Sequence, residues 1–279
     1  MGSGSWNTDS FVTYSTTSKC ATVDSLGIMH TDMTNQEMFK SRRVDASLDP
    51  KNVIRECRDS EEHPNTKPVI LALDVTGSMG NAAVEVAKML NVIMTRLYDQ
   101  VEDVEFCIMG IGDLYCDRGP IQISQFESDI RIAEQLDKVW FEFGGGGNLY
   151  ESYTAAWYMG TRHCDLDCWK RGDKGIIITI GDECCNPYLE KEKIYNFVGD
   201  IVQADIETES LFAEASQKYN IYHIQVDHDG YPWNETTITK SWQFLGDHFK
   251  RCNLDAISDT IIEIISNPMR RNDSKGISW

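Results

Sequence analysis

The chain has 279 residues, of which 41% are hydrophobic and 25% are charged, as expected of a globular protein with one large core. Its 44 Asp and Glu residues against 26 Lys and Arg residues give a formal net charge of −18. Nucleic acids and anionic membranes are bound by basic surfaces, so this balance argues against both as partners. The sequence also lacks the run of roughly 18 apolar residues that a membrane span needs.

The cysteines and the start of the chain indicate a reducing compartment. The nine cysteines are an odd number and are scattered, which is typical of free thiols rather than of a disulfide framework. The first residues contain neither the basic nor the apolar segment of a secretory signal. We therefore expect a cytoplasmic protein.

The composition divides the chain into three parts. Residues 1–66 are rich in Ser, Thr, Asp and Asn and show no sustained hydrophobic period, so we expect an extension that packs on the main domain or frays from it. Residues 67–268 form the predicted domain, and residues 269–279 form a C-terminal tail.

Within the domain, apolar runs alternate with apolar stripes at helical spacing. The run at 69–73 predicts a strand buried on both faces, and the stripe at 80–98 predicts a long helix. A second buried strand is predicted at 104–111. This alternation indicates an α/β fold with a Rossmann-like, mostly parallel sheet sandwiched by helices. The later elements are strands at 175–180 and 221–226 and helices near 130–140, 153–160, 211–219 and 256–265.

Oxygen-bearing side chains follow several of these strands. In open parallel sheets, ligands bind outside the carboxyl ends of the strands, so side chains that follow the strands meet at one edge. Carboxylates that converge there repel each other unless a cation neutralises them, and oxygen ligands select hard ions such as Mg²⁺, Mn²⁺ or Ca²⁺. The residues at these ends are Asp74, Thr76 and Ser78, then Asp113, then Asp182 and Glu183, with Asn148, Glu151 and Ser152 in a glycine-rich loop.

The segment from Asp74 to Gly80 is open to other interpretations. Thr76 and Ser78 precede a helix, where hydroxyl side chains often act as caps, and Asp74 could simply accept hydrogen bonds from the turn. The order Thr76-Gly77-Ser78-Met79-Gly80 also approaches the G-x-S-x-G nucleophile elbow of serine hydrolases. The triad would then combine Ser78 with Asp182 or Asp227 and with His228 or His248. We favour the metal site, because residues 1–66 lack the strands and oxyanion loop that precede such an elbow.

At these residues the sequence resembles a von Willebrand factor A (vWA) domain with a metal-ion-dependent adhesion site (MIDAS). That family carries Asp-x-Ser-x-Ser after its first strand, a Thr in a second loop and an Asp after a later strand. Thr76 replaces the first Ser and keeps its hydroxyl, and Asp182 matches the later Asp. Gly181 and Glu183 depart from the usual Thr-Asp-Gly, and no Thr follows the glycines until Thr154.

The stretches 113–118, 125–128, 144–153 and 181–183 are similar to an uncharacterised bacterial and phage group of intracellular A-domain proteins. A phage-encoded member would act in the host-cell cytoplasm or in the virion. The resemblance implies a six-stranded, mostly parallel sheet with one antiparallel edge strand. It also implies Mg²⁺ or Mn²⁺, with an open coordination position taken by an acidic side chain of a partner protein.

We therefore expect a non-enzymatic, metal-dependent protein-interaction module. Its ion ligands would be Asp74, Thr76, Ser78, Glu151 and Asp182, where Glu151 takes the place of the missing Thr. Four further residues could orient a water bound to the ion: Asp113, Asn148, Ser152 and Glu183. The alternatives are a structural subunit of a virion or complex with a stabilising metal site, and a serine hydrolase that uses Ser78.

Overall fold

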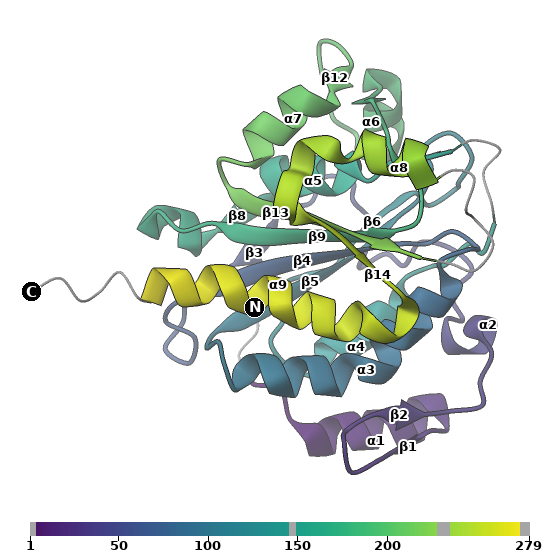
Figure 1. Cartoon of the computed structure of the whole chain (residues 1–279), viewed down its shortest axis with the longest axis vertical. Helices are drawn as coiled ribbons and strands as arrows, with labels where there is room; N and C mark the ends of the chain where they lie inside the picture. The colour runs from purple at the N-terminus through teal and green to yellow at the C-terminus, as the bar shows by residue number, and fades with distance from the viewer. Residues whose placement is uncertain (1–3, 145–148, 228–234, 274–279) are drawn as a thin grey trace, which may run out of the picture.

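At the centre of the protein is a six-stranded sheet with the strand order β14-β13-β9-β4-β5-β6 (Figure 1). The computed structural model describes residues 4–144, 149–227 and 235–273. Neighbouring strands are parallel except β6, which runs antiparallel to β5 at one edge. This sheet confirms the predicted fold class. Its strands are β4 (Lys67–Asp74), β5 (Val104–Ile111), β6 (Ile121–Ile123), β9 (Gly175–Gly181), β13 (Tyr219–Val226) and β14 (Phe249–Cys252).

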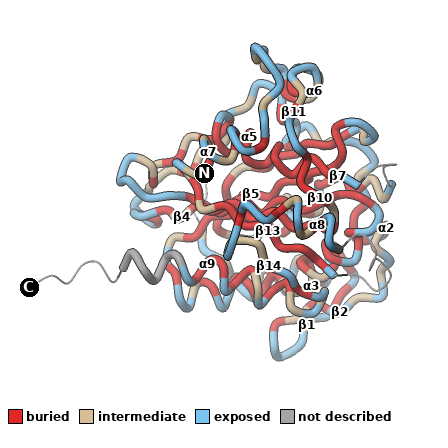
Figure 2. Tube along the Cα trace, turned by 45° about the horizontal axis from the view of Figure 1, so that its top comes forward, coloured by how far each residue is buried: buried red, intermediate tan, exposed pale blue. Residues whose placement is uncertain are grey.

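The central strand β4 shows why these residues form a sheet. Leu71 pairs in register with Ile108 of β5 and Ile178 of β9, so three apolar side chains lie abreast. Residues 68–74 are all buried, because helices cover both faces of the strand (Figure 2). A continuous apolar run is the pattern that burial on two faces produces.

Helices lie on both faces of the sheet (Figure 1). On one face, α3 packs against α9, and on the other α5 packs against α7. Each layer encloses its own cluster of buried hydrophobic side chains. The helices are α3 (Gly80–Tyr98), α4 (Arg131–Lys138), α5 (Thr154–Arg162), α6 (Lys191–Phe197), α7 (Thr208–Ala215), α8 (Glu235–Ser241) and α9 (Ile257–Asp273).

The segment before the sheet contains a helix that the sequence did not predict. Helix α1 (Thr8–Lys19) packs against α3, and Phe11 on it is fully buried. Lys19 is also buried and forms an ion pair with Asp137 (2.5 Å). The Trp6 indole donates a hydrogen bond to Asn91 of α3 (2.8 Å). The elements that follow are β1 (Thr22–Val23), β2 (Met29–His30), α2 (Asn35–Met38) and β3 (Arg55–Cys57).

Short strands complete the structure outside the sheet. They are β7 (Tyr150–Glu151), β8 (Cys164–Leu166), β10 (Cys184–Cys185), β11 (Tyr188–Leu189) and β12 (Ile206–Glu207). Turns of 3-10 helix lie at Asp167–Arg171, Gln243–His248 and Leu254–Ala256. Among the helices of the described ranges, none has the length and apolar character needed to cross a bilayer.

The burial of Phe11 gives a test of whether α1 is an integral part of the fold. Phe11→Ala is expected to lower the free energy of unfolding by about 3–5 kcal/mol, because it leaves a cavity between α1 and the core. The matched control is Val12→Ala on the same helix, whose side chain is 39% exposed. Urea unfolding measures both. Equal, small effects would show that α1 contributes little to the stability of the protein.

Candidate functional site

The predicted oxygen-bearing residues lie at the carboxyl edge of the sheet, on the right in Figure 1. Leu73 pairs with Gly110 of β5 and with Ile180 of β9, so the three central strands end at the same level. The register therefore places the loops that begin at Asp74, Gly112 and Asp182 beside one another.

The first loop is held by its own carboxylate. The backbone N–H and the hydroxyl of Thr76 both donate to Asp74 Oδ1, at 2.8 and 2.5 Å. The hydroxyl oxygens of Thr76 and Ser78 are 3.5 Å apart. The N-cap of α3 is Met79, and no side chain caps the helix there. The predicted hydroxyl cap is therefore wrong, whereas the prediction that Asp74 accepts hydrogen bonds from the turn is confirmed. The Ser78 hydroxyl lies beside that of Thr76, which donates to Asp74.

Gly77 allows the glycine-rich segment to approach this loop. The Gly77 N–H donates to the Gly144 carbonyl (2.7 Å). A Cβ at position 77 would lie 2.9 Å from the Phe143 carbonyl oxygen, closer than side chains tolerate. Residues 145–148 lie outside the described ranges, and with them the predicted water-orienting residue Asn148.

Tyr153 is a site residue that the sequence interpretation missed. Its hydroxyl donates to Asp74 Oδ2 (2.8 Å) and accepts from the Glu183 N–H (3.3 Å). The ring is fully buried and lies against His223 and Trp242. A Cβ at position 181 would be 1.9 Å from the hydroxyl oxygen, so only glycine fits there. The departure of Gly181 from the usual Thr was the one signal that could have revealed this tyrosine.

Glu151 approaches the Asp74 loop from the segment between the glycine run and α5. Strand β7 pairs with β10 and places Glu151 opposite Cys185, two residues beyond Glu183. Glu151 is 5% exposed, and among the described residues its Oε2 has no hydrogen-bond partner. Burial, and then the negative charges of Asp74, Asp117 and Asp113, raise the pKa of Glu151 far above its ordinary value. Without a cation, this carboxyl therefore holds its proton at neutral pH.

The pKa of Asp74 is raised for the same reasons. The first cause is burial and the second is the charge of Asp182, which opposes the stabilising hydrogen bonds from Thr76 and Tyr153. Burial and Asp182 also raise the pKa of Glu183, to about 7. In the described ranges, the strongest influences on the pKa values of Asp74 and Glu151 include no Lys or Arg side chain. Acidic groups thus meet in a buried place with little positive charge.

The other predicted residues surround this group. The Asp113 side chain accepts from the Tyr115 N–H (2.9 Å), and Ser152 Oγ accepts from the Leu114 N–H (3.1 Å). Asp117, which the sequence interpretation did not assign, accepts from the Asp113 N–H (2.8 Å). Burial is the first cause that raises the pKa of Asp117. The second loop therefore adds two carboxylates to the surroundings of Glu151.

The donor set suits a hard cation but is not arranged as a finished coordination sphere. Within residues 4–144, 149–227 and 235–273, no three His, Cys, Asp or Glu side chains are grouped as metal ligands. The hydroxyls of Thr76 and Ser78 and the unbonded Glu151 Oε2 are nevertheless the oxygen donors that Mg²⁺ takes, often with several waters. Ion binding would thus need waters or a small movement of the loops.

The serine hydrolase interpretation finds no support in this geometry. The Ser78 hydroxyl lies 3.5 Å from the Thr76 hydroxyl, and no histidine of the described ranges is hydrogen-bonded to it. His248 Nδ1 donates to the Ile221 carbonyl, in the first half of β13, whereas Ser78 lies beyond the opposite end of β4. His228 is outside the described residues.

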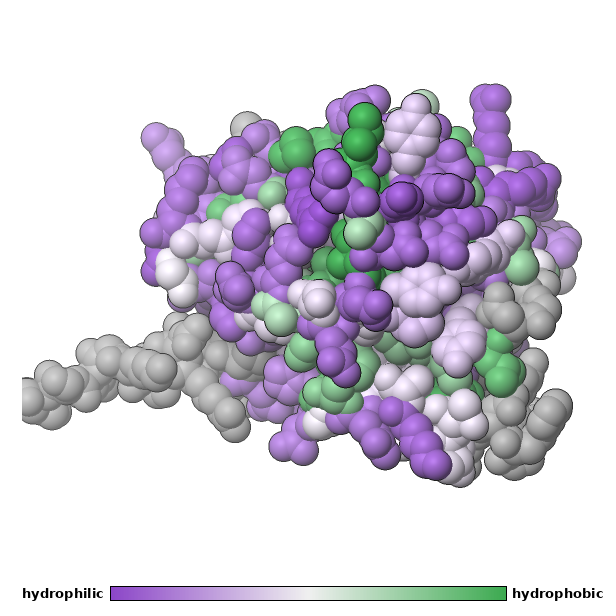
Figure 3. Space-filling model, turned by 90° about the horizontal axis from the view of Figure 1, so that it is seen from above, coloured by the Kyte–Doolittle hydropathy of each residue, from purple (hydrophilic) through white to green (hydrophobic). Residues whose placement is uncertain are grey.

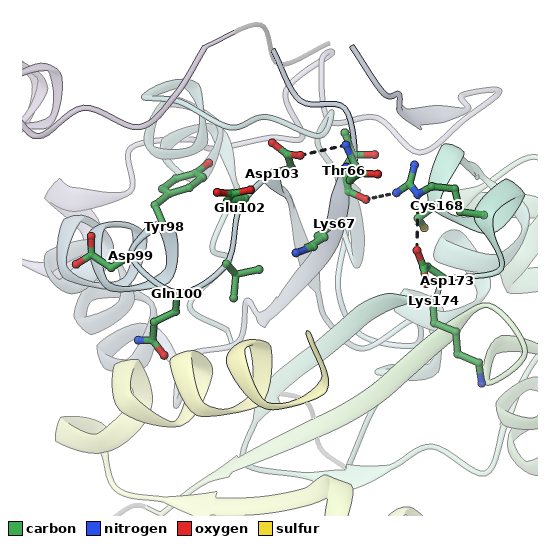
Figure 4. A pocket seen from close by; sticks show the side chains of 13 residues that line it. Thr66, Lys67, Tyr98, Asp99, Gln100, Glu102, Asp103, Cys168, Asp173 and Lys174 are labelled. Carbon is green, nitrogen blue, oxygen red and sulfur yellow. Dashed lines mark hydrogen bonds and ion pairs between the residues drawn. The ribbon is translucent and has the colours of Figure 1, made fainter. Parts of the chain in front are cut away.

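A separate hollow of about 670 Å³ lies at the amino edge of the sheet (Figure 4). Lys67 begins β4 there, and Lys174 directly precedes β9. Its walls are held by internal bonds, including the Arg171 guanidinium to the Thr66 carbonyl (2.9 Å) and the Asn65 N–H to Asp103 (3.0 Å). This hollow is at the other end of the strands from the carboxylates, so it does not belong to the predicted site.

No family model and no curated protein matches the chain. Among solved structures, two forms of the pilus adhesin SpaC from Lactobacillus rhamnosus GG are similar to it, with TM-scores of 0.51 and 0.49 and identities of 11% and 14%. The similarity covers 78% of this chain but only 32% and 31% of SpaC, so the chain spans about a third of that protein. The vWF domain of the type V pili tip protein Mfa5 from Porphyromonas gingivalis matches with a TM-score of 0.45 and 12% identity, over 73% of this chain and 96% of that domain. At these identities, the likeness to SpaC concerns the fold alone.

The raised pKa values predict how the stability of the metal-free protein depends on pH. As pH rises, the carboxyl groups of Asp74 and Glu183 lose their protons at lower pH in the unfolded chain than in the folded state. Between pH 4.5 and about 7 the folded state therefore binds more protons than the unfolded chain. The free energy of unfolding should therefore fall as pH rises through this range. Urea unfolding in the presence of a chelator from pH 4.5 to 8 measures the slope of this free energy against pH.

Glu151→Gln removes one buried carboxyl group and should stabilise the metal-free protein by about 1 kcal/mol or more at pH 8. Urea unfolding of the variant measures this, and a destabilised variant would contradict the assignment.

The contact between Gly181 and Tyr153 predicts a coupled pair of mutations. Gly181→Ala should lower the free energy of unfolding by about 1–3 kcal/mol, because the new methyl group displaces the tyrosine. Gly144→Ala is the control, since a Cβ there meets nothing within 4 Å. In a Tyr153→Ala background the same Gly181→Ala change should cost much less. Additive losses in the double variant would show that the two positions act independently.

Proposed function

We propose that this chain is a metal-dependent protein-interaction module. A divalent cation, Mg²⁺ in the first place and Mn²⁺ or Ca²⁺ as substitutes, would bind through Asp74, Thr76, Ser78, Glu151 and Asp182. An acidic side chain of a partner protein would complete the coordination. The observation that carries the proposal is the meeting of buried carboxyl groups from three loops beside two hydroxyls.

A bound cation would change the protonation of the acidic side chains at the candidate site. Without it, burial and nearby negative charges raise the pKa of Asp74 to about 7 and keep a proton on Glu151 at neutral pH. With it, the carboxylates become ionised ligands, so binding should release protons. Tyr153 is a positioning residue here: its hydroxyl fixes Asp74 Oδ2 and leaves Oδ1 to the side of Thr76. The hydroxyl ligands carry no charge, so the ion keeps its attraction for an incoming carboxylate.

The surroundings support a role in binding rather than in chemistry. SpaC, whose fold this chain resembles, is a pilus adhesin. Away from the site, the face over α6, α7 and α8 is mostly hydrophilic, with hydrophobic areas between the polar side chains (Figure 3). The acidic balance of the chain still argues against nucleic acid as that partner.

We also propose a cytoplasmic location. All nine cysteines are free thiols in the structure, and seven of them are buried. Proteins in reducing compartments keep their thiols in this state. Alkylation of the cysteines in the protein isolated from its own cell tests this: nine modified thiols after denaturation support the location, and disulfides oppose it.

The ion site is tested by calorimetric titration with Mg²⁺ after removal of metal with a chelator. Asp74→Asn keeps the size of the side chain and should weaken Mg²⁺ binding more than about tenfold. Asp247→Asn removes the same charge from an exposed position and should leave binding unchanged. Tyr153→Phe should weaken binding about tenfold, because Asp74 loses the donor that orients it. Equal binding by the wild type and Asp74→Asn would overturn the assignment.

A further inference from the structure

A second hollow, of about 400 Å³, lies beside the candidate ion site. We name it the tyrosine pocket, after Tyr115, Tyr150 and Tyr188, which line it together with Glu190 and Lys193. The three tyrosines are 55%, 45% and 39% exposed, although large aromatic side chains usually lie inside proteins. Exposed aromatic rings gathered around one hollow are a feature of binding surfaces.

Internal hydrogen bonds hold the walls of this pocket. The Asn186 amide donates to Thr154 Oγ1 (2.6 Å) and to the Tyr188 carbonyl (3.0 Å), and its oxygen accepts from the Thr154 N–H (3.2 Å). Asn186 is 7% exposed, so it ties the segment before Tyr188 to helix α5. Burial, and then the neighbouring Glu190 and Tyr188 side chains, raise the pKa of the Tyr115 hydroxyl. The backbone that carries Tyr188 is thus held in place before any ligand arrives, which lowers the entropic cost of binding.

The lining of the pocket is suited to a positively charged group. Lys193 of the chain itself already places its ammonium 4.6 Å from the centre of the Tyr115 ring, so a cation is stable against this wall. Asp113 and Glu190 contribute two carboxylates to the lining against the one ammonium of Lys193, and the whole chain carries a charge of −18. Charge complementarity thus favours a cationic occupant.

The pocket is continuous with the ion site. Tyr150 and Ser152 line the pocket, and they are the two neighbours of Glu151 in the chain. Asp113 also lines it and is one of the charges that raise the pKa of Glu151. A partner segment that offers a carboxylate to the ion would therefore place its neighbouring side chains at the tyrosines.

We propose that the tyrosine pocket binds an arginine side chain of the partner protein, next to the partner carboxylate that completes the coordination of the ion. This inference rests on the proposed function, in which a partner carboxylate binds the ion, and it adds an arginine as the second group of the partner that is recognised. Arginine fits better than lysine, because its planar guanidinium stacks on aromatic faces and donates two parallel hydrogen bonds to a carboxylate such as Glu190. The bound guanidinium would lie against the tyrosine rings with Glu190 at its edge.

The test uses N-acetyl-L-arginine methylamide as the probe and the full chain as the protein. Binding is followed by the chemical shifts of the backbone amides of Tyr188 and Lys193 in a chelator-containing buffer. The matched probe is N-acetyl-L-citrulline methylamide, which has nearly the same shape and no charge. We expect saturable shifts with the arginine probe and at least about fivefold weaker binding of the citrulline probe. Equal binding of both probes, or no saturable shift, would overturn the proposal.

Two variants locate the probe. Tyr188→Ala removes one wall, and Glu190→Gln removes the carboxylate with little change of shape. Each should weaken the arginine probe about three- to tenfold. Tyr195→Ala is the control, because Tyr195 is 59% exposed and belongs to helix α6 outside this pocket. Unchanged affinity in Glu190→Gln would contradict the proposal even if Tyr188→Ala failed to fold.

The chelator separates this proposal from the one on which it rests. Arginine binding in the absence of metal, with citrulline rejected, supports the pocket whatever the result of the Mg²⁺ titration. Mg²⁺ binding that depends on Asp74, together with no discrimination between the two probes, supports the ion site and overturns the arginine contact. The two results are thus read from different titrations.

Discussion

The repulsion between buried acidic groups at one edge of the sheet constrains the rest of this structure. The parallel register of β4 and β9 brings together the loops that begin at Asp74 and Asp182, and the pairing of β7 with β10 adds Glu151. Burial raises the cost of each negative charge, and every neighbouring carboxylate raises it further. A fold that keeps such a group in its interior needs either protons or a cation there, and at neutral pH a divalent cation neutralises more than one of them.

Tyr153 shows how the protein positions the Asp74 carboxylate. A buried tyrosine usually serves as core, and this ring does pack against His223 and Trp242. Its hydroxyl, however, reaches Asp74 through space that only a glycine at position 181 leaves open. Gly181 of β9 therefore leaves room for Tyr153, which precedes α5, and Tyr153 in turn orients the Asp74 carboxylate at the end of β4.

The sequence predicted the inner part of the fold better than its margins. Helix α3 and strand β5 were predicted at their observed bounds, because an apolar stripe and an apolar run mark them clearly. Helix α1 was missed because its buried positions are Phe11, Ser15 and Lys19, which form no apolar stripe. The predicted site residues in the described ranges do gather at one edge. Tyr153 and Asp117 were not predicted as site residues, since their contacts cross between loops that are distant in the chain.

The connections among the loops join the ion site to the tyrosine pocket. The Ser152 N–H donates to the Gly112 carbonyl (3.4 Å), and the Cys184 N–H donates to the Leu149 carbonyl (3.0 Å), so residues 149–152 bridge the loops that follow β5 and β9. A cation bound by Glu151 would shift residues 149–152, because Glu151 lies within this segment. Tyr150 and Ser152 would then move with it, and both line the pocket. Since the sheet beneath is rigid and buried, the movement would stay in these loops. Occupation of the ion site would in this way adjust the surface that a partner meets, and a partner seated in the pocket would favour the ion-bound arrangement in return.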